Sequence, residues 1–252
     1  MAGLGAGTPS GDRLLIVQRA SGSEPLVLSF SGGKDSVLAL AALRRGHAFR
    51  VTRLLTTVTR EYRRIAMHGV RETLLDRQAE ALGLPLDKVY LTAQGGQDEY
   101  EDRMRERLLG YEAQGIGRVA FGDLFLEDIR VYRERQLALV GMQGEFPLWG
   151  QETRRLALDF IDQGFEAVVV CVDTEQLAAE FAGRPFDRSF LSDLPLEVDP
   201  AGERGEFHTF VHAGPLFSAP VGFTGGDRVR REGRFEYYDL RPHPDPTDPR
   251  SG

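Results

Sequence analysis

The sequence of 252 residues contains a single cysteine, Cys171. One cysteine cannot form an internal disulfide, a CxxC redox pair or a cysteine-rich zinc site, and this scarcity is typical of a reducing compartment. Long apolar runs are missing as well, because no stretch approaches the roughly 18 residues that a membrane-spanning helix needs. The N-terminal stretch, MAGLGAGTPSGDR, lacks the apolar centre of a signal peptide. We therefore expect a cytoplasmic protein without membrane association.

Positive charge is also in short supply. The chain has 31 lysines and arginines against 38 aspartates and glutamates, which gives a formal net charge of −7. This balance argues against general binding to nucleic acids or anionic membranes, because both depend on basic protein surfaces. Lysine itself is scarce, since Lys34 and Lys88 are the two lysines of the chain.

Strand and helix patterns alternate along the first two thirds of the chain. Short apolar or β-branched runs predict strands, and longer segments with helical spacing predict helices between them. The alternation predicts an α/β fold with a mainly parallel sheet and helices on both faces. Turn-rich, aromatic hairpins at 215–240 predict a smaller, mixed α+β unit after it. The expected strands are 26–30, 49–59, 88–92, 118–123, 144–150 and 167–173, and the expected helices are 36–46, 70–83, 98–115, 127–141 and 151–163.

Composition divides the chain further. We expect a flexible N-terminal segment at 1–24, rich in glycine and serine, and a disordered, proline-rich tail at 241–252. Between them we expect a nucleotide-binding domain at 25–145 and a C-terminal domain at 146–240 that holds a second substrate.

The polar loop SGGKDS, at 31–36, lies between the first expected strand and the first expected helix. Ligands of open parallel sheets bind beyond the carboxyl ends of the strands, which is where this loop would lie. Gly32 and Gly33 allow a ligand to approach the backbone closely, and backbone N–H groups at a helix N-terminus attract anions. Lys34 adds a positive charge. The loop therefore indicates a phosphate site.

The common P-loop, G-x-x-x-x-G-K-[ST], does not fit this stretch. Its first glycine would fall on Leu28 and its Ser/Thr on Asp35. The loop instead resembles the PP-loop, S-G-G-x-D-S, of the N-type ATP pyrophosphatases. That resemblance implies an adenine nucleotide alpha hydrolase-like (HUP-like) fold and cleavage of ATP between its α- and β-phosphates.

Three further stretches narrow the resemblance: AMHGVRE at 66–72, FGDLFLEDIRVYRERQLALVGMQGEFPLWGQET at 121–153, and AGERGEFHTFVHAGPLF at 201–217. In this order they are similar to the motifs of the diphthine–ammonia ligase family of ATP-binding proteins. The family implies that ATP, with Mg²⁺, adenylates an acceptor carboxylate, which ammonia or an amine then attacks. The acceptor would be a small molecule or a protein.

The resemblance assigns roles residue by residue. It implies that Asp35 helps to hold Mg²⁺, and that Lys34, Asp35, Glu203 and Glu206 are catalytic. The residues implied to hold ATP are Ser31, Gly32, Gly33, Lys34, Asp35, Ser36, His68, Gly69, Gly122 and Asp123, with His68 and Gly69 beside the adenosine. Those implied to contact the acceptor are Glu127, Phe207, His208 and Thr209.

The chain departs from the family in the region implied to bind the acceptor. Ala201 stands where many members have a cysteine, and GEFHTF replaces GEYETF, so that Phe207 and His208 stand for a tyrosine and a glutamate. These changes indicate a bacterial-type relative whose acceptor is not diphthine.

Two other functions stay open at this point. One is an RNA-modifying enzyme that adenylates a base oxygen, although the net charge and the missing CxxC count against it. The other is an adenine-nucleotide-binding protein without turnover. His208 and His212, four residues apart, suggest a metal pair, but no further histidine or cysteine lies nearby in the sequence. A homodimer is an option that the sequence leaves open.

Overall fold

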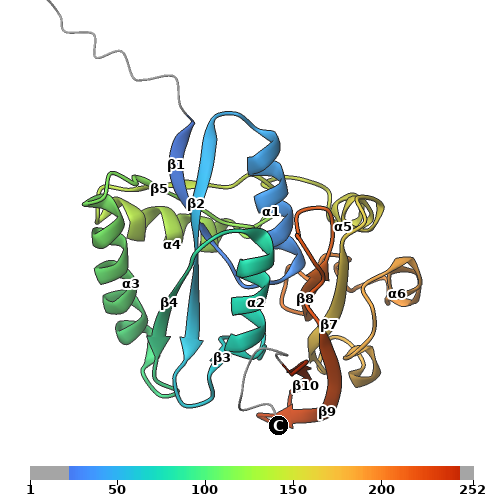
Figure 1. Cartoon of the computed structure of the whole chain (residues 1–252). Helices are drawn as coiled ribbons and strands as arrows, with labels where there is room; N and C mark the ends of the chain where they lie inside the picture. The colour runs from blue at the N-terminus through green and yellow to red at the C-terminus, as the bar shows by residue number, and fades with distance from the viewer. Residues whose placement is uncertain (1–22, 245–252) are drawn as a thin grey trace, which may run out of the picture.

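The computed structural model describes residues 23–244, which form two β-sheets that lie side by side (Figure 1). Residues 24–145 contain the first sheet and residues 166–242 the second. The segments expected to be flexible or disordered lie mostly outside the described residues. The ends of these segments that the structure does describe belong partly to strands: Glu24 begins the first strand, and the last strand continues to Pro242.

The first sheet is mainly parallel, as the alternating sequence predicts. Its parallel strands run in the order β4-β2-β1-β5-β6, and the short β3 pairs antiparallel with the end of β2. The order reverses between β1 and β5, and such a reversal places a ligand-binding crevice at the carboxyl ends of the strands. The strands are β1 (Glu24–Ser29), β2 (Phe49–Thr59), β3 (Arg64–Ile65), β4 (Leu86–Leu91), β5 (Arg118–Ala120) and β6 (Gln143–Glu145).

Helices cover both faces of this sheet (Figure 1). Leu26 and Leu28 of β1 point into one apolar core and Val27 into another, because successive strand side chains point to opposite faces. One face carries α1 (Lys34–Arg45) and α2 (Glu72–Leu82), and the other carries α3 (Gly96–Glu112) and α4 (Glu127–Ala138). The predicted α/β fold is thereby confirmed.

The second sheet is antiparallel, with the strand order β8-β7-β10-β9. The expected C-terminal hairpin is present as β9 and β10, joined by a tight turn. The connection from the first sheet is α5 (Thr153–Asp162), and a 3₁₀ turn and a short helix follow β7. The elements are β7 (Glu166–Asp173), η1 (Ala179–Phe181), α6 (Arg188–Asp193), β8 (Phe207–Ala213), β9 (Phe223–Arg231) and β10 (Phe235–Pro242).

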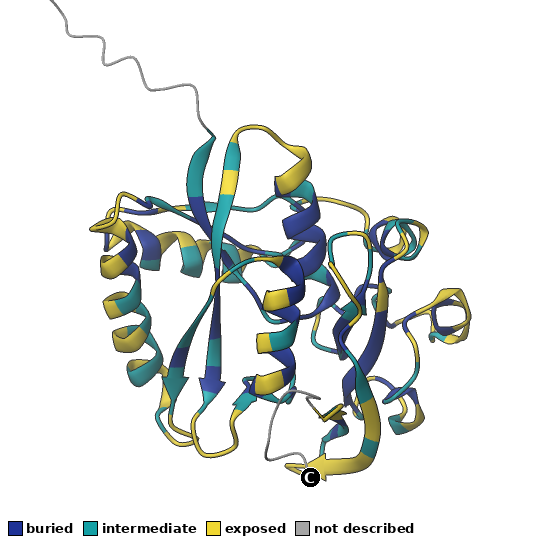
Figure 2. Ribbon diagram, in the orientation of Figure 1, coloured by how far each residue is buried: buried dark blue, intermediate teal, exposed yellow. Residues whose placement is uncertain are grey.

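A continuous apolar core joins the two sheets. It contains residues of β1 and α1 together with residues of β7, β8 and β10. Figure 2 shows α1 and β7 as mostly buried, whereas α3 presents a long exposed face. The second sheet thus packs against α1, the helix that follows the SGGKDS loop. Among residues 23–244, no helix combines the length and apolarity needed to cross a membrane.

Candidate functional site

The SGGKDS loop connects β1 to α1 at the carboxyl edge of the first sheet. Gly32 has a φ of +82°, and a Cβ at this position would lie 2.5 Å from Leu75 and 2.6 Å from Gln78, so that only glycine fits. The hydroxyl of Ser36 donates to the carbonyl of Gly33 at 2.9 Å. The loop therefore has a fixed shape at the N-terminus of α1, where backbone N–H groups favour an anion.

Strand β8 of the second sheet fixes the same loop from outside. The backbone N–H of Val211 donates to the carbonyl of Gly32 at 3.0 Å, and the N–H of Lys34 donates to the hydroxyl of Thr209 at 3.0 Å. The buried amide of Gln78 donates to the carbonyls of Gly32 and Val211, at 3.0 and 2.6 Å. The SGGKDS loop, α2 and β8 thus share one hydrogen-bond network, in which Gln78 and Val211 are 133 residues apart in the sequence.

A cavity of about 260 Å³ opens at this loop, and we call it the loop cavity. It brings together residues that the sequence placed in one site from both halves of the chain. Those expected residues are Ser31, Lys34, Asp35, Ser36, His68, Gly122, Asp123, Glu203, Phe207, His208 and Thr209. The cavity also contains residues that the sequence did not indicate: Ser29, Phe121, Arg133, Gly202 and Gly205.

Lys34 and Asp35 carry opposite charges at the floor of the loop cavity. The ammonium of Lys34 lies 2.9 Å from Oδ2 of Asp35, and 5.4 Å from the centre of the Phe207 ring. Burial raises the pKa of Asp35, and the charge of Lys34 opposes that rise. The second oxygen of Asp35, Oδ1, is shielded from solvent and has no hydrogen-bond partner. An unpartnered carboxylate oxygen beside an anion site is a suitable ligand for Mg²⁺, which favours carboxylate and phosphate oxygens together.

Asp123 follows β5 and also lines the loop cavity. Its carboxylate forms an ion pair with Arg133 of α4, with Oδ2 lying 2.7 Å from Nε. Gly122, just before it, packs against the backbone of Asp35, where a Cβ would come within 2.9 Å. A larger residue at 122 would therefore push the two loops apart. No sequence signal distinguished Arg133 from the other arginines of its helix.

Glu203 reaches the loop cavity from the glycine-rich loop before β8. Its Oε1 accepts a hydrogen bond from the backbone N–H of Leu124 at 2.7 Å, which ties this loop to the first sheet. The pKa of Glu203 is raised to about 7, mainly by burial and also by the negative charges of Asp35 and Asp123, against the hydrogen bond from Leu124 and the charge of Lys34. The carboxyl group can therefore exchange a proton near neutral pH.

His68 and His208 form a pair of neutral rings at the rim of the loop cavity. Their ring centres lie 4.5 Å apart, and Nδ1 of His68 is shielded from solvent without a hydrogen-bond partner. Burial lowers the pKa of His68 to about 4 and that of His208 well below its usual value. The turn that carries His68 is strained at Met67, a non-glycine residue with a φ of +62°, whereas the following Gly69 adopts its φ of +67° freely.

Other expected residues do not line the loop cavity. Glu127 begins α4, and Gly69 instead contacts Tyr237 in a neighbouring cleft. Glu206 is buried, and its two carboxylate oxygens accept backbone hydrogen bonds from Asp199 and Arg204 at 2.9 and 3.0 Å. Glu206 thus shapes the loop that carries Glu203. Gly32 and Gly33 shape the SGGKDS loop through their backbone groups alone.

The two histidines of β8 do not make a metal site. His212 packs edge-on against Phe223, with ring centres 5.2 Å apart. Within residues 23–244, the structure contains no cluster of three or more histidine, cysteine, aspartate or glutamate side chains able to hold a metal ion. Any Mg²⁺ at Asp35 would need phosphate oxygens as further ligands.

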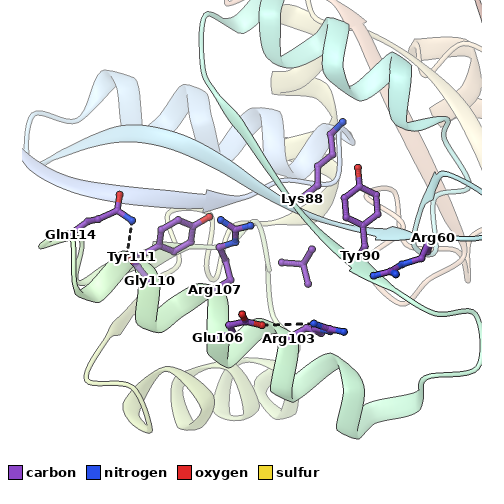
Figure 3. Close-up of a pocket in the computed structure, with 10 residues that line it drawn as sticks. Arg60, Lys88, Tyr90, Arg103, Glu106, Arg107, Gly110, Tyr111 and Gln114 are labelled. Carbon is purple, nitrogen blue, oxygen red and sulfur yellow. Dashed lines mark hydrogen bonds and ion pairs between the residues drawn. The ribbon is translucent and has the colours of Figure 1, made fainter.

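Two further pockets adjoin the first sheet. A slot between α3 and α4, lined by Met104, Leu108 and Tyr132, shares Ser29, Phe121 and Arg133 with the loop cavity. A larger pocket between β4 and α3 contains arginine side chains and Tyr111 (Figure 3). None of the expected site residues lines that second pocket.

Comparison with protein families matches nearly all of the described chain. The model of the diphthamide synthase N-terminal domain matches residues 25–144, and that of the diphthamide synthase C-terminal domain matches residues 152–237. No curated protein matches the chain. The two matched regions meet at the loop cavity, which takes its walls from both of them.

Proposed function

The chain belongs to the diphthamide synthase family, and from this premise we propose that it is a ligase that converts ATP to AMP and pyrophosphate. An oxygen of an acceptor carboxylate attacks the α-phosphorus of ATP, and the bond to the β-phosphate oxygen breaks. Pyrophosphate leaves with that electron pair. Ammonia or an amine then attacks the carbonyl carbon of the adenylate, loses a proton, and AMP leaves. The amide is the product.

The observation that carries this proposal is the SGGKDS loop, held open at the N-terminus of α1 with Lys34 inside the cavity. The backbone N–H groups of the loop and the ammonium of Lys34 suit the β- and γ-phosphates, which become the leaving group. Asp35 would hold Mg²⁺ through its unpartnered Oδ1, together with phosphate oxygens. The ion would neutralise the charge that develops on the departing pyrophosphate.

The adenine would occupy the slot between α3 and α4. Met104, Leu108 and Leu137 give this slot apolar walls, and it shares Ser29, Phe121 and Arg133 with the loop cavity. A nucleotide with its phosphates on the loop would cross the carboxyl edge of β1 and β5 to reach it. This arrangement differs from the expectation that His68 and Gly69 flank the adenosine, because both residues face the second sheet.

Glu203 would take the proton that the attacking nitrogen loses. It lies in the loop cavity on the C-terminal side, and its pKa of about 7 suits a group that accepts a proton near neutral pH. Glu206 would act indirectly, because its carboxylate holds the backbone of the loop on which Glu203 stands. The geometry thus separates the two glutamates that the sequence grouped together as catalytic.

The test is the identity of the nucleotide product. Purified protein is incubated with ATP, Mg²⁺, ammonium chloride and a panel of carboxylic acids, and the nucleotides are separated by chromatography. AMP with pyrophosphate supports the proposal, and ADP with phosphate contradicts it. Lys34→Met should abolish the reaction, whereas Lys88→Met, which also removes an ion-paired lysine, should not.

A further inference from the structure

A second cleft, of about 440 Å³, adjoins the loop cavity. It lies between the strained turn after β3, which belongs to the first sheet, and the hairpin β9–β10 of the second sheet. His208 lines both the cleft and the loop cavity, and the adjacent His68 packs against it. The cleft and the loop cavity therefore share one lining residue, His208.

The walls of the cleft are aromatic and aliphatic. Tyr62, Met67 and Val229 line it with 54%, 65% and 41% of their side chains exposed. They are three of the seven large apolar side chains that the described part of the chain leaves exposed. Phe235 and Tyr237 line the cleft beside them. Exposed apolar side chains that gather in one hollow mark a binding site for a partly apolar ligand.

The charges of the cleft are largely balanced. Asp239 is paired with Arg64, their atoms 2.9 Å apart, and Asp227 is paired with Arg241 at 2.8 Å. Arg231 and Glu232, adjacent in the turn of the hairpin, carry opposite charges, and the guanidinium of Arg231 lies 5.2 Å from the Tyr62 ring. A polyanion such as RNA needs an excess of basic groups, which this cleft does not offer. A molecule with few charges suits it better.

The inner end of the cleft is polar. His208 lines the cleft there, and the neutral ring of His68, which lines the loop cavity, packs against it. Lys34 is close enough to both histidines for its charge to lower their pKa values. A carboxylate at this end would gain a hydrogen bond from His208, and the ammonium of Lys34, although paired with Asp35, would add positive charge nearby.

We propose that this cleft binds the molecule that the ligase activates, and that this molecule is a small carboxylate with a flat apolar body. Its carboxylate lies at the His68–His208 end, and its body lies along Met67 and Val229. The inference rests on the proposed function and adds the class of the acceptor to it. It also excludes an RNA as the occupant.

The test uses dansylglycine, a carboxylate on a fluorescent naphthalene, as the probe. Its emission is titrated with the wild-type protein and with Val229→Arg and Val229→Trp, which place a charge or a bulky ring in the cleft. The matched controls are Val131→Arg and Val131→Trp, because Val131 is a 53% exposed valine on α4 and does not line the cleft. ATP binding is measured by calorimetry in every variant, which checks that each one is folded.

We expect saturable binding to the wild type and to both controls, and a loss of affinity of about tenfold or more in both Val229 variants, whose ATP binding is unchanged. No binding, or equal binding in the Val229 and Val131 variants, would overturn the inference. Displacement of the probe by transfer RNA would overturn it as well. If the probe binds in a Val229-dependent way while ATP yields ADP, the cleft stands as a carboxylate site and the ligase proposal fails.

Discussion

The backbone N–H of Lys34 donates a hydrogen bond to the hydroxyl of Thr209, 175 residues later in the chain, at a distance of 3.0 Å. Lys34 begins α1 on the first sheet, and Thr209 lies in β8 of the second. Thr209 therefore takes one of the N–H groups that a helix leaves free at its start. The shape of the SGGKDS loop depends on the C-terminal sheet as well as on its own glycines.

Thr209→Val should weaken both the fold and the binding of ATP. The substitution keeps the shape of the 2% exposed side chain but leaves the N–H of Lys34 without an acceptor. We expect the free energy of unfolding to fall by about 1–3 kcal/mol and the affinity for ATP to fall by about tenfold as the loop loosens. Urea unfolding and calorimetry measure the two effects.

Thr52→Val is the matched control for this substitution. Thr52 donates its hydroxyl hydrogen bond to the carbonyl of Leu26 at 3.0 Å, near the amino ends of β1 and β2 and away from the loop. It should lower stability by a similar amount and leave the affinity for ATP unchanged. Equal losses of affinity in the two variants would show that the Lys34–Thr209 contact has no special role in nucleotide binding.

The place of the SGGKDS loop between a strand and a helix could be predicted from sequence because its signals are local. Two glycines, a lysine and hydroxyls occupy consecutive positions between an apolar run and a helical run, and the structure places them as expected. The parallel sheet was predictable for the same reason, since alternating strands and helices leave few other folds. Helix and strand boundaries shift by only a few residues from the expected ones, as with α1, expected at 36–46 and found at 34–45.

What the sequence missed depends on contacts between distant segments. β7 is apolar on both faces, like a strand of a parallel sheet, yet it pairs antiparallel with β8 and β10. Gln78 stands at a core position of an amphipathic helix, and its link to Gly32 appears only once β8 is in place. Glu206 and Glu203 belong to one motif, but one carboxylate faces backbone N–H groups and the other the cavity.

The slot between α3 and α4 gives a prediction about the adenine base. Met104→Trp places a ring in the slot and should reduce the affinity for ATP by about tenfold or more, as expected for loss of a buried base contact. The affinity for pyrophosphate, which contacts only the loop, should stay the same. Calorimetric titration with each of the two ligands measures the difference.

Leu109→Trp serves as the control on the same helix, because Leu109 is 49% exposed and does not line the slot. Its affinities for ATP and pyrophosphate should match those of the wild type. If Met104→Trp weakens the binding of pyrophosphate as much as that of ATP, or weakens neither, the adenine lies elsewhere.

His68 should make the protein less stable in acid. Its pKa is about 4 in the folded protein and 6.5 in an unfolded chain, so the unfolded state binds more protons between these values. Stability that is present above pH 6.5 is therefore lost as the pH falls toward 4. Between pH 7 and pH 4.5 we expect the free energy of unfolding to fall less in His68→Gln than in the wild type, by about 1–3 kcal/mol. Urea unfolding at the two pH values measures the difference. His47→Gln changes an exposed histidine and is the control, so its stability should depend on pH as that of the wild type does. Identical pH profiles for all three proteins would contradict the burial of a neutral His68.

Glu203 should make the protein less stable at high pH, which is the opposite of the effect of His68. Its folded pKa of about 7 lies above the ordinary pKa of a glutamate, 4.5, so the folded state binds more protons than the unfolded state between these values. Stability is therefore complete below pH 4.5 and is lost as the pH rises through 7. Glu203→Gln has no such loss and keeps an oxygen for the N–H of Leu124. We expect the free energy of unfolding of this variant to exceed that of the wild type by about 1–3 kcal/mol at pH 8 and to match it below pH 4.5.

Glu197→Gln, a change at an exposed glutamate, is the control and should show no gain at pH 8. The same pair of variants separates stability from chemistry. If Glu203 accepts the proton of the attacking nitrogen, Glu203→Gln should form AMP more slowly at pH 8 even though it is the more stable protein there. A variant that is both more stable and fully active would keep the raised pKa and remove Glu203 from the reaction. A Glu203→Gln variant that is less stable than the wild type at pH 8 would contradict the raised pKa. It would show that the folded protein stabilises the ionised carboxylate despite its burial and the two neighbouring aspartates.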